Sequence, residues 1–493
     1  MRQLTSLDAQ FLALEDGRAL GHVGGLAIYE PETADGDPLD VERVRALLSE
    51  RLHMLPPFRW RLVEVPFGLD HPYWIEDDEF DLEFHVRELA LPAPGNTLQL
   101  AEQTSRIFSR QLDRAHPLWE LYVISGLEDG SVAMLTKIHH AAVDGVSGAE
   151  ILAVLLDFDP AGREIPEPEE RETEQQPGEL EMLSRGLTGM WKQPVRAIRA
   201  APRVLPNLDS VPTMRTMPGV KTIAGASRRV ARLMPRQRPR TVLEGHSLSA
   251  PHTRFQERIS AHRRFAFGSL SLSEVKEIKN EFGCTVNDVV MAICTSALRS
   301  WLLERDELPA DPLISMVPVS VRTPEQIGTY GNRVSVMIVP LPSNVADPLE
   351  RLRQMNRTMS SAKERHQALP ASLLGDANHF IPPALFAQAA RVTSRVSLLR
   401  GVEAPVNVTI SNVPGSPAPL YCAGAQQRGT YPISAIIDGV GLNITVFSYQ
   451  DSLDFGIVAD REQMDDPWPL LGAIREGLAE LRVLAPAGVP APG

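Results

Sequence analysis

The chain has 493 residues and a net charge of −13, with 43% hydrophobic and 23% charged residues. Its length exceeds what one hydrophobic core usually fills, which predicts two domains, and its ordinary composition excludes a wholly disordered or fibrous protein. Because the negative charge repels a phosphate backbone, we expect no nucleic-acid partner.

Two further features bear on where the protein works. The three cysteines are few and odd in number, which favours a reducing compartment without a disulfide framework. Residues 1–16 lack an apolar core of signal-peptide length, and no segment approaches the roughly 20 apolar residues that span a bilayer. We therefore expect a protein that is not secreted, and that is cytoplasmic or attached to a membrane from one side.

Residues 1–158 alternate amphipathic helices, such as Val41–Leu52, with short strands. Leu121–Gly126 and Ser131–His140 flank a segment containing an Asp-Gly turn signal, which predicts a hairpin whose second strand ends at two histidines. We interpret this region as an α/β domain.

Residues 159–261 have a different composition and form a predicted connector. Glutamates and prolines crowd together at its start, as is typical of an exposed linker. Leu183–Leu205 then carries basic and apolar residues at helical spacing, which predicts a basic amphipathic helix weakened by two prolines. A run of arginines follows in Arg228–Arg240. These charges would attract anionic lipid headgroups or nucleotide phosphates, or they are simply a solvated face.

Residues 262–484 return to a dense pattern that predicts a second α/β domain, followed by a disordered tail at 485–493. A helix is expected from Ser271, with capping-box spacing and Gly283 placed to end it, and another from Thr285. Strands are expected at Ile314–Val321, Val334–Val339, Val406–Ile410 and Leu442–Phe447. Two domains joined by a long connector predict a ligand cleft or tunnel between them.

The most informative segment follows the predicted hairpin and reads His139-His140-x-x-x-Asp144-Gly145. Adjacent strand residues point to opposite faces, so the two histidines cannot converge on one metal, and we expect none. The chain turns at Asp144-Gly145 and enters a helix near Ser147, so one histidine is held where strand becomes helix. A neutral imidazole fixed there can act as a general base toward an alcohol. The alternative is that both histidines only end a strand.

Two sites in the second domain are further candidates. Alternation places Asn407, Thr409 and Ser411 on one face of a strand, which suits a cavity wall but also a solvent-facing strand. Asn287 and Asp288 lie in the first turn of the helix that Thr285 caps, where a carboxylate is favoured whatever the function.

Familiar catalytic motifs of other enzyme classes are absent or incomplete. Gly145-Val146-Ser147-Gly148 falls short of a nucleophile elbow because Ala149 follows it, and Asp454-Phe455-Gly456 has none of the motifs that accompany it in kinases. The sequence therefore does not support a serine hydrolase or a kinase.

The histidine motif resembles the signature of the acyl-CoA-dependent acyltransferase superfamily, which includes chloramphenicol acetyltransferase and nonribosomal condensation domains. Several segments, in order, resemble the bacterial wax ester synthase/diacylglycerol acyltransferase family. They are Leu7–Leu12, Pro57–Leu62, Phe80-Asp81, His85–Arg87, Pro117–Glu120, Asn287–Val289, Val317–Arg322, Gly331–Arg333 and Ser411–Gly415.

The resemblance implies an α/β fold made of two chloramphenicol-acetyltransferase-like domains, with a tunnel between them and a long, partly helical connector. It implies His140 as the general base, with His139 in a supporting role. Asp144 would hold local structure by pairing with an arginine, for which Arg59 and Arg61 are candidates. The implied substrate-binding residues are Gly145, Asn287, Ser411 and Asn412.

The resemblance also implies a reaction. A long-chain acyl group would pass from acyl-CoA to diacylglycerol, giving triacylglycerol, or to a long-chain fatty alcohol, giving a wax ester. No bound cofactor or metal is expected. The partners would be the substrates and a membrane or lipid-inclusion surface at the cytoplasmic side. A homodimer with a second copy of the chain is a further expectation. Two rivals are a polyketide-associated type of acyltransferase with a carrier-bound donor and a non-catalytic protein that coats lipid droplets.

Overall fold

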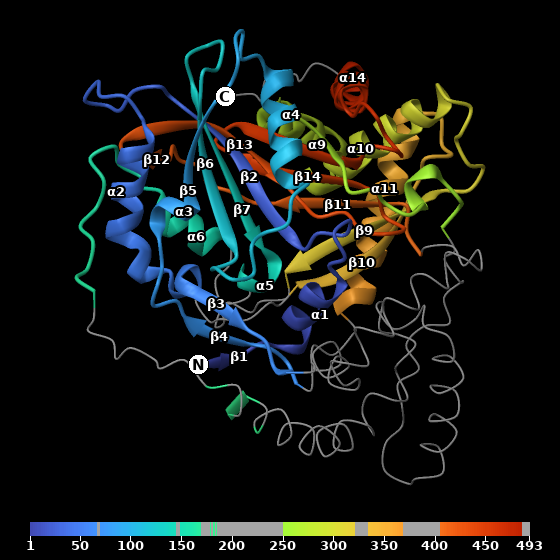
Figure 1. Cartoon of the computed structure of the whole chain (residues 1–493). Helices are drawn as coiled ribbons and strands as arrows, with labels where there is room; N and C mark the ends of the chain where they lie inside the picture. Colours follow the sequence, from blue (N-terminus) through green and yellow to red (C-terminus); the bar gives the residue numbers. More distant parts are fainter. Residues whose placement is uncertain are drawn as a thin grey trace.

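The computed structural model describes residues 1–66, 70–143, 148–168, 178, 181–182, 184, 250–320, 334–367 and 405–485. In this part of the chain, two six-stranded sheets lie side by side and a three-stranded sheet adjoins the first (Figure 1). Helices cover the sheets, so the fold is α/β as expected.

The first sheet has the strand order β12-β13-β2-β7-β6-β5. Strand β7 is central and pairs antiparallel with both neighbours, and β6 and β7 are the two strands of the predicted hairpin. Their apolar runs are buried on both faces, which fits a strand covered by helices on each side. The strands are β2 (His22–Tyr29), β5 (Val86–Ala90), β6 (Trp119–Ser125), β7 (Val132–His139), β12 (Tyr421–Cys422) and β13 (Ala425–Ile433).

Helices and short turns surround this sheet. Helix α2 confirms the predicted amphipathic helix, and its N-cap Asp40 accepts a hydrogen bond from the Arg43 amide. The helices are α1 (Ser6–Leu14), α2 (Val41–Arg51), α3 (Leu82–His85), α4 (Thr97–Phe108), α5 (His140–Val143) and α6 (Gly148–Leu155), with 3₁₀ turns at Leu52–Met54, Pro56–Arg59 and Arg254–Gln256. The small sheet contains β1 (Arg2–Gln3), β3 (Trp60–Val63) and β4 (Tyr73–Glu76).

The second sheet has the order β10-β9-β11-β14-β15-β8 and mixes parallel and antiparallel pairs. Strand β11 is parallel to both β9 and β14, which buries it at the centre of the sheet. The four predicted strands are confirmed with shifted ends. The strands are β8 (Arg263–Ser271), β9 (Leu313–Ser320), β10 (Val334–Leu341), β11 (Val408–Val413), β14 (Leu442–Tyr449) and β15 (Ser452–Asp460).

The helices of the second half form its core with this sheet. Helix α9 (Leu272–Phe282) begins at its predicted cap and ends at Gly283, which has the left-handed backbone that glycine tolerates best. Helix α10 (Val286–Leu303) has a full capping box made by Thr285 and Asp288. Helices α11 (Pro348–Gln367) and α14 (Trp468–Leu484) pack beside α10 (Figure 1).

Helix α10 corrects one sequence expectation. By length and composition it is apolar enough to cross a membrane, although the sequence pattern indicated that no segment is. However, 72% of that segment is buried inside the protein, where its side chains join the core of the second half. We therefore interpret α10 as a core helix.

The two halves share structure that local sequence patterns did not indicate. Strands β12 and β13 come from the second half of the chain but pair with β2 in the first sheet. One apolar cluster also combines side chains of both halves, including Leu135 and Phe108 with Phe265 and Val458. The first sheet and its histidines are thus built on contacts with the second half.

Several predictions fall outside the described residues. They concern the basic helix at Leu183–Leu205, the arginine run at Arg228–Arg240, the motif at Gly331–Arg333 and the tail after residue 485. The tunnel between the halves and the domain limits at residues 158 and 262 stay predictions.

Candidate active site

The two histidines lie where strand β7 gives way to helix α5. His139 is the last residue of β7 and stands opposite His22 on β2. His140 is the first residue of α5, and α5 packs against α1. The sequence predicted a strand that ends at the histidines, and β7 ends one residue earlier, at His139. The helix expected near Ser147 corresponds to α6, whereas the short helix α5 was not predicted.

His139 is enclosed, with 1% of its surface exposed. Its amide donates to the Leu118 carbonyl at 2.9 Å, and its Nδ1 accepts a hydrogen bond from the Ala141 amide at 3.1 Å. Because Nδ1 is an acceptor, the ring proton belongs on Nε2. Nε2 lies 3.3 Å from Oε1 of Glu15, close enough for an electrostatic contact although not aligned as a hydrogen bond. The imidazole therefore has a fixed tautomer and orientation.

Glu15 is the carboxylate that faces His139. Burial alone would raise the pKa of Glu15, but the imidazole of His139, the Gly21 amide at 2.9 Å and the Arg114 guanidinium at 2.9 Å outweigh burial and lower it to about 2. Glu15 is therefore ionised at neutral pH and supplies a negative charge beside the ring.

Gly21 brings the backbone close to both histidines. Its carbonyl accepts a hydrogen bond from the His140 amide at 2.8 Å. A Cβ atom added at Gly21 would lie 2.7 Å from Nε2 of His139, closer than real contacts allow. Only glycine fits this position without displacing the imidazole.

His140 has a different environment from its neighbour. Its ring stacks on Phe11 of α1, with ring centroids 4.1 Å apart and planes 20° apart. The side chain is half-buried, so it is neither sealed in the core nor fully exposed to solvent. A stacked, half-buried imidazole on a fixed backbone has the access and rigidity that a general base needs.

Lys137 shares the face of β7 that carries His139 and is also enclosed. Its Nζ donates to the carbonyls of Ile107 at 3.2 Å and Arg110 at 2.6 Å, and lies 3.6 Å from Glu120. Burial lowers the pKa of Lys137 to about 8, against the opposing pull of Glu120. This ammonium ties the end of α4 to the strand that bears the histidines.

His22 completes this buried face. Its Nε2 lies 2.8 Å from the Phe108 carbonyl, so it donates there. Burial, followed by the charge of Lys137, lowers the pKa of His22 to about 3. His22 is therefore neutral at working pH and adds no charge beside His139.

The segment Pro117–Trp119 supports strand β7. The Leu118 carbonyl holds the His139 amide, and the Trp119 indole donates to the Phe58 carbonyl at 2.8 Å. Trp119 also stacks on Phe58 and on His85, at centroid distances of 4.8 and 4.5 Å. This aromatic cluster packs the segments Pro57–Leu62, His85–Arg87 and Pro117–Glu120 against one another.

Asp144 lies outside the described residues, so its partner stays a prediction. The two candidate arginines each face another carboxylate. Arg59 lies 3.5 Å from Glu76, and Arg61 lies 3.4 Å from Asp77.

Gly145 also lies outside the described residues, and its assignment to substrate binding stays a prediction. Within the described ranges, no three His, Cys, Asp or Glu side chains are grouped as metal ligands.

The structure brings together two of the predicted substrate-binding residues. The Asn412 amide, near the end of β11, donates to Oδ1 of Asn287 in the first turn of α10, at 3.3 Å. Both side chains are half-buried. Asp288 instead has a structural role, since its carboxylate accepts from the Thr285 amide and the Asn356 side chain, both at 2.9 Å.

The polar row on β11 is buried, so the solvent-facing alternative is wrong. Asn407, which precedes the strand, is fully enclosed, and Thr409 is 6% exposed. The Asn407 side chain accepts from the Ile314 amide at 2.8 Å and donates to the Pro251 carbonyl at 2.6 Å. Its hydrogen-bonding groups are thus used by the backbone, and only Ser411 in this row is half-buried.

Sequence reasoning missed Glu15 and Gly21. Both belong to a segment far from the histidines in sequence, and neither stands in a pattern of its own. A single glutamate after an apolar helix gives no sign that it will be buried against an imidazole.

Two family models match the chain. The wax ester synthase/diacylglycerol acyltransferase catalytic domain matches residues 4–290, and the C-terminal domain of the same family matches residues 330–482. A probable diacylglycerol O-acyltransferase of Mycobacterium tuberculosis is 34% identical over 478 residues, covering 96% of this chain and 97% of the relative. A putative diacylglycerol O-acyltransferase of the same organism is 35% identical over 489 residues, covering 97% and 99%.

Solved structures give the same picture of the fold. The wax ester synthase/diacylglycerol acyltransferase from Marinobacter aquaeolei VT8 is 29% identical and aligns with a TM-score of 0.69 over 99% of this chain and all of that one. The first condensation domain of the calcium-dependent antibiotic synthetase aligns with a TM-score of 0.55 at 13% identity, over 98% and 96%. That second likeness concerns the fold alone.

Proposed function

Because the chain belongs to the wax ester synthase/diacylglycerol acyltransferase family, we propose that it transfers a long-chain acyl group from acyl-CoA to diacylglycerol, making triacylglycerol. A long-chain fatty alcohol is the second acceptor and would give a wax ester. The mycobacterial relatives, named as diacylglycerol O-acyltransferases, support diacylglycerol as the first choice.

The observation that carries this proposal is the position of His140. Its backbone is fixed by Gly21, and its ring is stacked on Phe11 and half-buried. An imidazole in such a place can accept a proton from a substrate hydroxyl while bulk water has limited access to the ring.

The proposed reaction is a direct transfer. His140 accepts the hydroxyl proton as the alcohol oxygen attacks the thioester carbon, and a tetrahedral intermediate forms. The carbon–sulfur bond then breaks, coenzyme A leaves as its thiolate, and the imidazolium returns the proton to that sulfur. Holding both substrates in line would supply much of the rate acceleration.

The other residues have supporting roles in this proposal. His139 fixes the end of β7 through its hydrogen bond with the Ala141 amide and its contact with Glu15. We propose that Asp144 holds local structure by pairing with an arginine and that Gly145 takes part in substrate binding. Asn287, Asn412 and Ser411 line the substrate passage, supported by the contact between the two asparagines. No metal or bound cofactor takes part.

We propose that the protein works at the cytoplasmic side of a membrane or on lipid inclusions, because both the acceptor and the product are water-insoluble. The basic residues of Leu183–Leu205 and Arg228–Arg240 would meet anionic headgroups there. Binding to vesicles with and without phosphatidylglycerol tests this part: equal binding to both would contradict it.

A donor and acceptor panel tests the reaction itself. Purified protein would be given radiolabelled palmitoyl-CoA with dioleoylglycerol, hexadecanol or no acceptor, and separately palmitoyl-acyl-carrier protein with dioleoylglycerol. We expect labelled triacylglycerol from palmitoyl-CoA, less wax ester, and little product from the carrier-bound donor. Product formed with palmitoyl-acyl-carrier protein but not with palmitoyl-CoA would support the polyketide-associated type of acyltransferase. If no pair of donor and acceptor gave product, the lipid-coating protein would be supported.

A further inference from the structure

The segment Glu15–Gly21, which we call the brace loop, joins α1 to β2 and contacts both histidines at its ends. Glu15 faces the His139 imidazole, and the Gly21 carbonyl holds the His140 amide. The loop is short and internally bonded: the Asp16 carboxylate accepts from the backbone amides of Arg18 and Ala19 at 3.2 and 3.1 Å. A displacement of its middle would therefore be transmitted to its ends.

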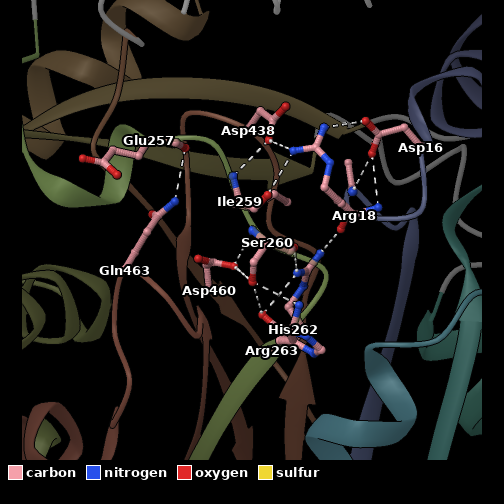
Figure 2. Close-up of polar contacts among 11 residues, drawn as sticks. Asp16, Arg18, Glu257, Ile259, Ser260, His262, Arg263, Asp438, Asp460 and Gln463 are labelled. Carbon is pink, nitrogen blue, oxygen red and sulfur yellow. Dashed lines mark hydrogen bonds and ion pairs between the residues drawn. The ribbon is translucent and has the colours of Figure 1, made fainter.

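The middle of the brace loop is attached to the second half of the chain. Nη1 of Arg18 donates to the Ile259 carbonyl at 3.1 Å and lies 3.8 Å from Oδ1 of Asp438 (Figure 2). That same Oδ1 accepts a hydrogen bond from the Ile259 amide at 3.0 Å. Arg18 thus contacts Ile259 and Asp438, two residues that are already joined by a hydrogen bond.

A second arginine binds the brace loop from the other direction. The guanidinium of Arg263, at the start of β8, donates to the Arg18 carbonyl and, at 2.8 Å, to the Ser260 carbonyl (Figure 2). Its backbone amide also donates to the Ser109 hydroxyl at the end of α4, at 3.0 Å. Arg263 is 6% exposed, so little solvent competes for these hydrogen bonds.

Asp460 fixes the segment that carries Arg263. It stands opposite Arg263 in the pairing of β15 with β8 and is fully enclosed. Its Oδ1 accepts hydrogen bonds from the Ser260 amide at 2.7 Å and the Ser260 hydroxyl at 2.6 Å (Figure 2). The Ser260 carbonyl in turn accepts from Arg263, so the guanidinium is anchored before it reaches the brace loop.

We infer that Arg263, assisted by Arg18, is a positioning residue for the histidine pair. The side chain of Arg263 connects a rigid strand of the second half to the brace loop, and the ends of that loop set the places of His139 and His140. The placement of the base then depends on how the two halves of the chain are docked. This inference rests on the proposed function of His140 as the general base.

The test replaces Arg263 by Met, which keeps most of the aliphatic part of the side chain but removes its donors. The matched control is Arg428→Met. Arg428 lies on β13 and also joins the halves, by ion pairs with Glu30 and Asp129, but it does so at the end of β2 away from the histidines. For each variant, kcat and KM for palmitoyl-CoA with dioleoylglycerol are measured, along with the melting temperature.

We expect R263M to lower kcat by about tenfold with KM within about twofold, since a small misplacement of a catalytic group is costly. R428M should keep kcat within about twofold, and Arg263→Lys, which can still donate to the Arg18 carbonyl, should recover most of the loss. A wild-type kcat for R263M, or an equal loss in R428M, would overturn the inference.

A second variant protects the test against poor folding. Arg18→Gln replaces the guanidinium that reaches the Ile259 carbonyl by a shorter, neutral amide. The Arg18 side chain is 24% exposed, so the fold tolerates this change better. We expect a loss of several-fold in kcat, and an unchanged kcat would again overturn the inference. His140→Ala is assayed in parallel. If it stays active, the proposed function fails; if it is inactive while R263M and R18Q match the wild type, only the positioning role fails.

Discussion

Polar side chains are buried both on strand β7 in the first half of the chain and next to strand β11 in the second half. The two sets differ in chemical kind. On β7 the enclosed groups are ionisable, Lys137 and His139, and each lies beside a carboxylate. Before β11 the enclosed group is Asn407, a neutral amide bound to backbone atoms.

This difference distinguishes a region that can take part in the reaction from one that stabilises the fold. Buried ionisable groups cost free energy unless charges and hydrogen bonds surround them, and their pKa values respond to small changes. Buried amides that satisfy backbone groups stabilise the fold at any pH. We therefore expect changes near β7 to affect the reaction or its pH dependence, and changes at Asn407 to affect stability alone.

Among the changes that keep the His140 side chain, the largest effect is expected from Gly21→Ala. The new methyl group would push the His139 imidazole from its place, so kcat should fall on the order of a hundredfold. Gly25→Ala, on the adjoining strand β2, is the control, since its added Cβ would have ordinary contacts, the nearest at 3.7 Å. Steady-state assays with palmitoyl-CoA compare the two. Similar rates for both variants would show that the close approach of Gly21 does not matter.

The next effect concerns the pH dependence of stability. The folded protein lowers the pKa of Lys137 from 10.5 to about 8, so between these values the unfolded chain binds more protons and stability rises with pH. This gain is worth about 2 to 3 kcal/mol and should be absent in Lys137→Met. Urea unfolding at pH 7.5 and pH 10.5 measures it. An equal pH response in wild type and variant would mean that the lysine is not destabilised by burial.

The smallest effect is expected from Asn407→Ala. Loss of the amide leaves the Ile314 amide and the Pro251 carbonyl unsatisfied, so the free energy of unfolding should fall by about 1 to 3 kcal/mol. The loss should be the same at both pH values, and kcat per folded molecule should stay at the wild-type level. A lower kcat in correctly folded N407A would place this amide in the reaction and remove the contrast between the two regions.

Much of the fold could be predicted from local signals. Helices α9 and α10 begin at the Ser and Thr caps seen in the sequence, and Gly283 ends α9 as expected. The hairpin of β6 and β7 follows from its apolar runs and Asp-Gly turn. These features depend on residues close together in the chain, so their patterns are visible without knowing the fold.

The long-range features could not be predicted in this way. Strand β13 joins the first sheet although it comes from the second half, because its partner β2 has a free edge that no local pattern reveals. Glu15 and Gly21 matter only through their distance from His139, and Arg263 only through its contact with the brace loop. The histidine motif itself was found because it is compact.

The proposed reaction depends most on His140 as the proton acceptor, and a single-turnover experiment tests this role most directly. Wild type and His140→Ala, each in excess over radiolabelled palmitoyl-CoA, would be mixed with dioleoylglycerol, and binding of palmitoyl-CoA would be measured separately. The account predicts acyl transfer slower by about a hundred- to ten-thousandfold with binding nearly unchanged. Transfer by H140A at the wild-type rate would contradict it.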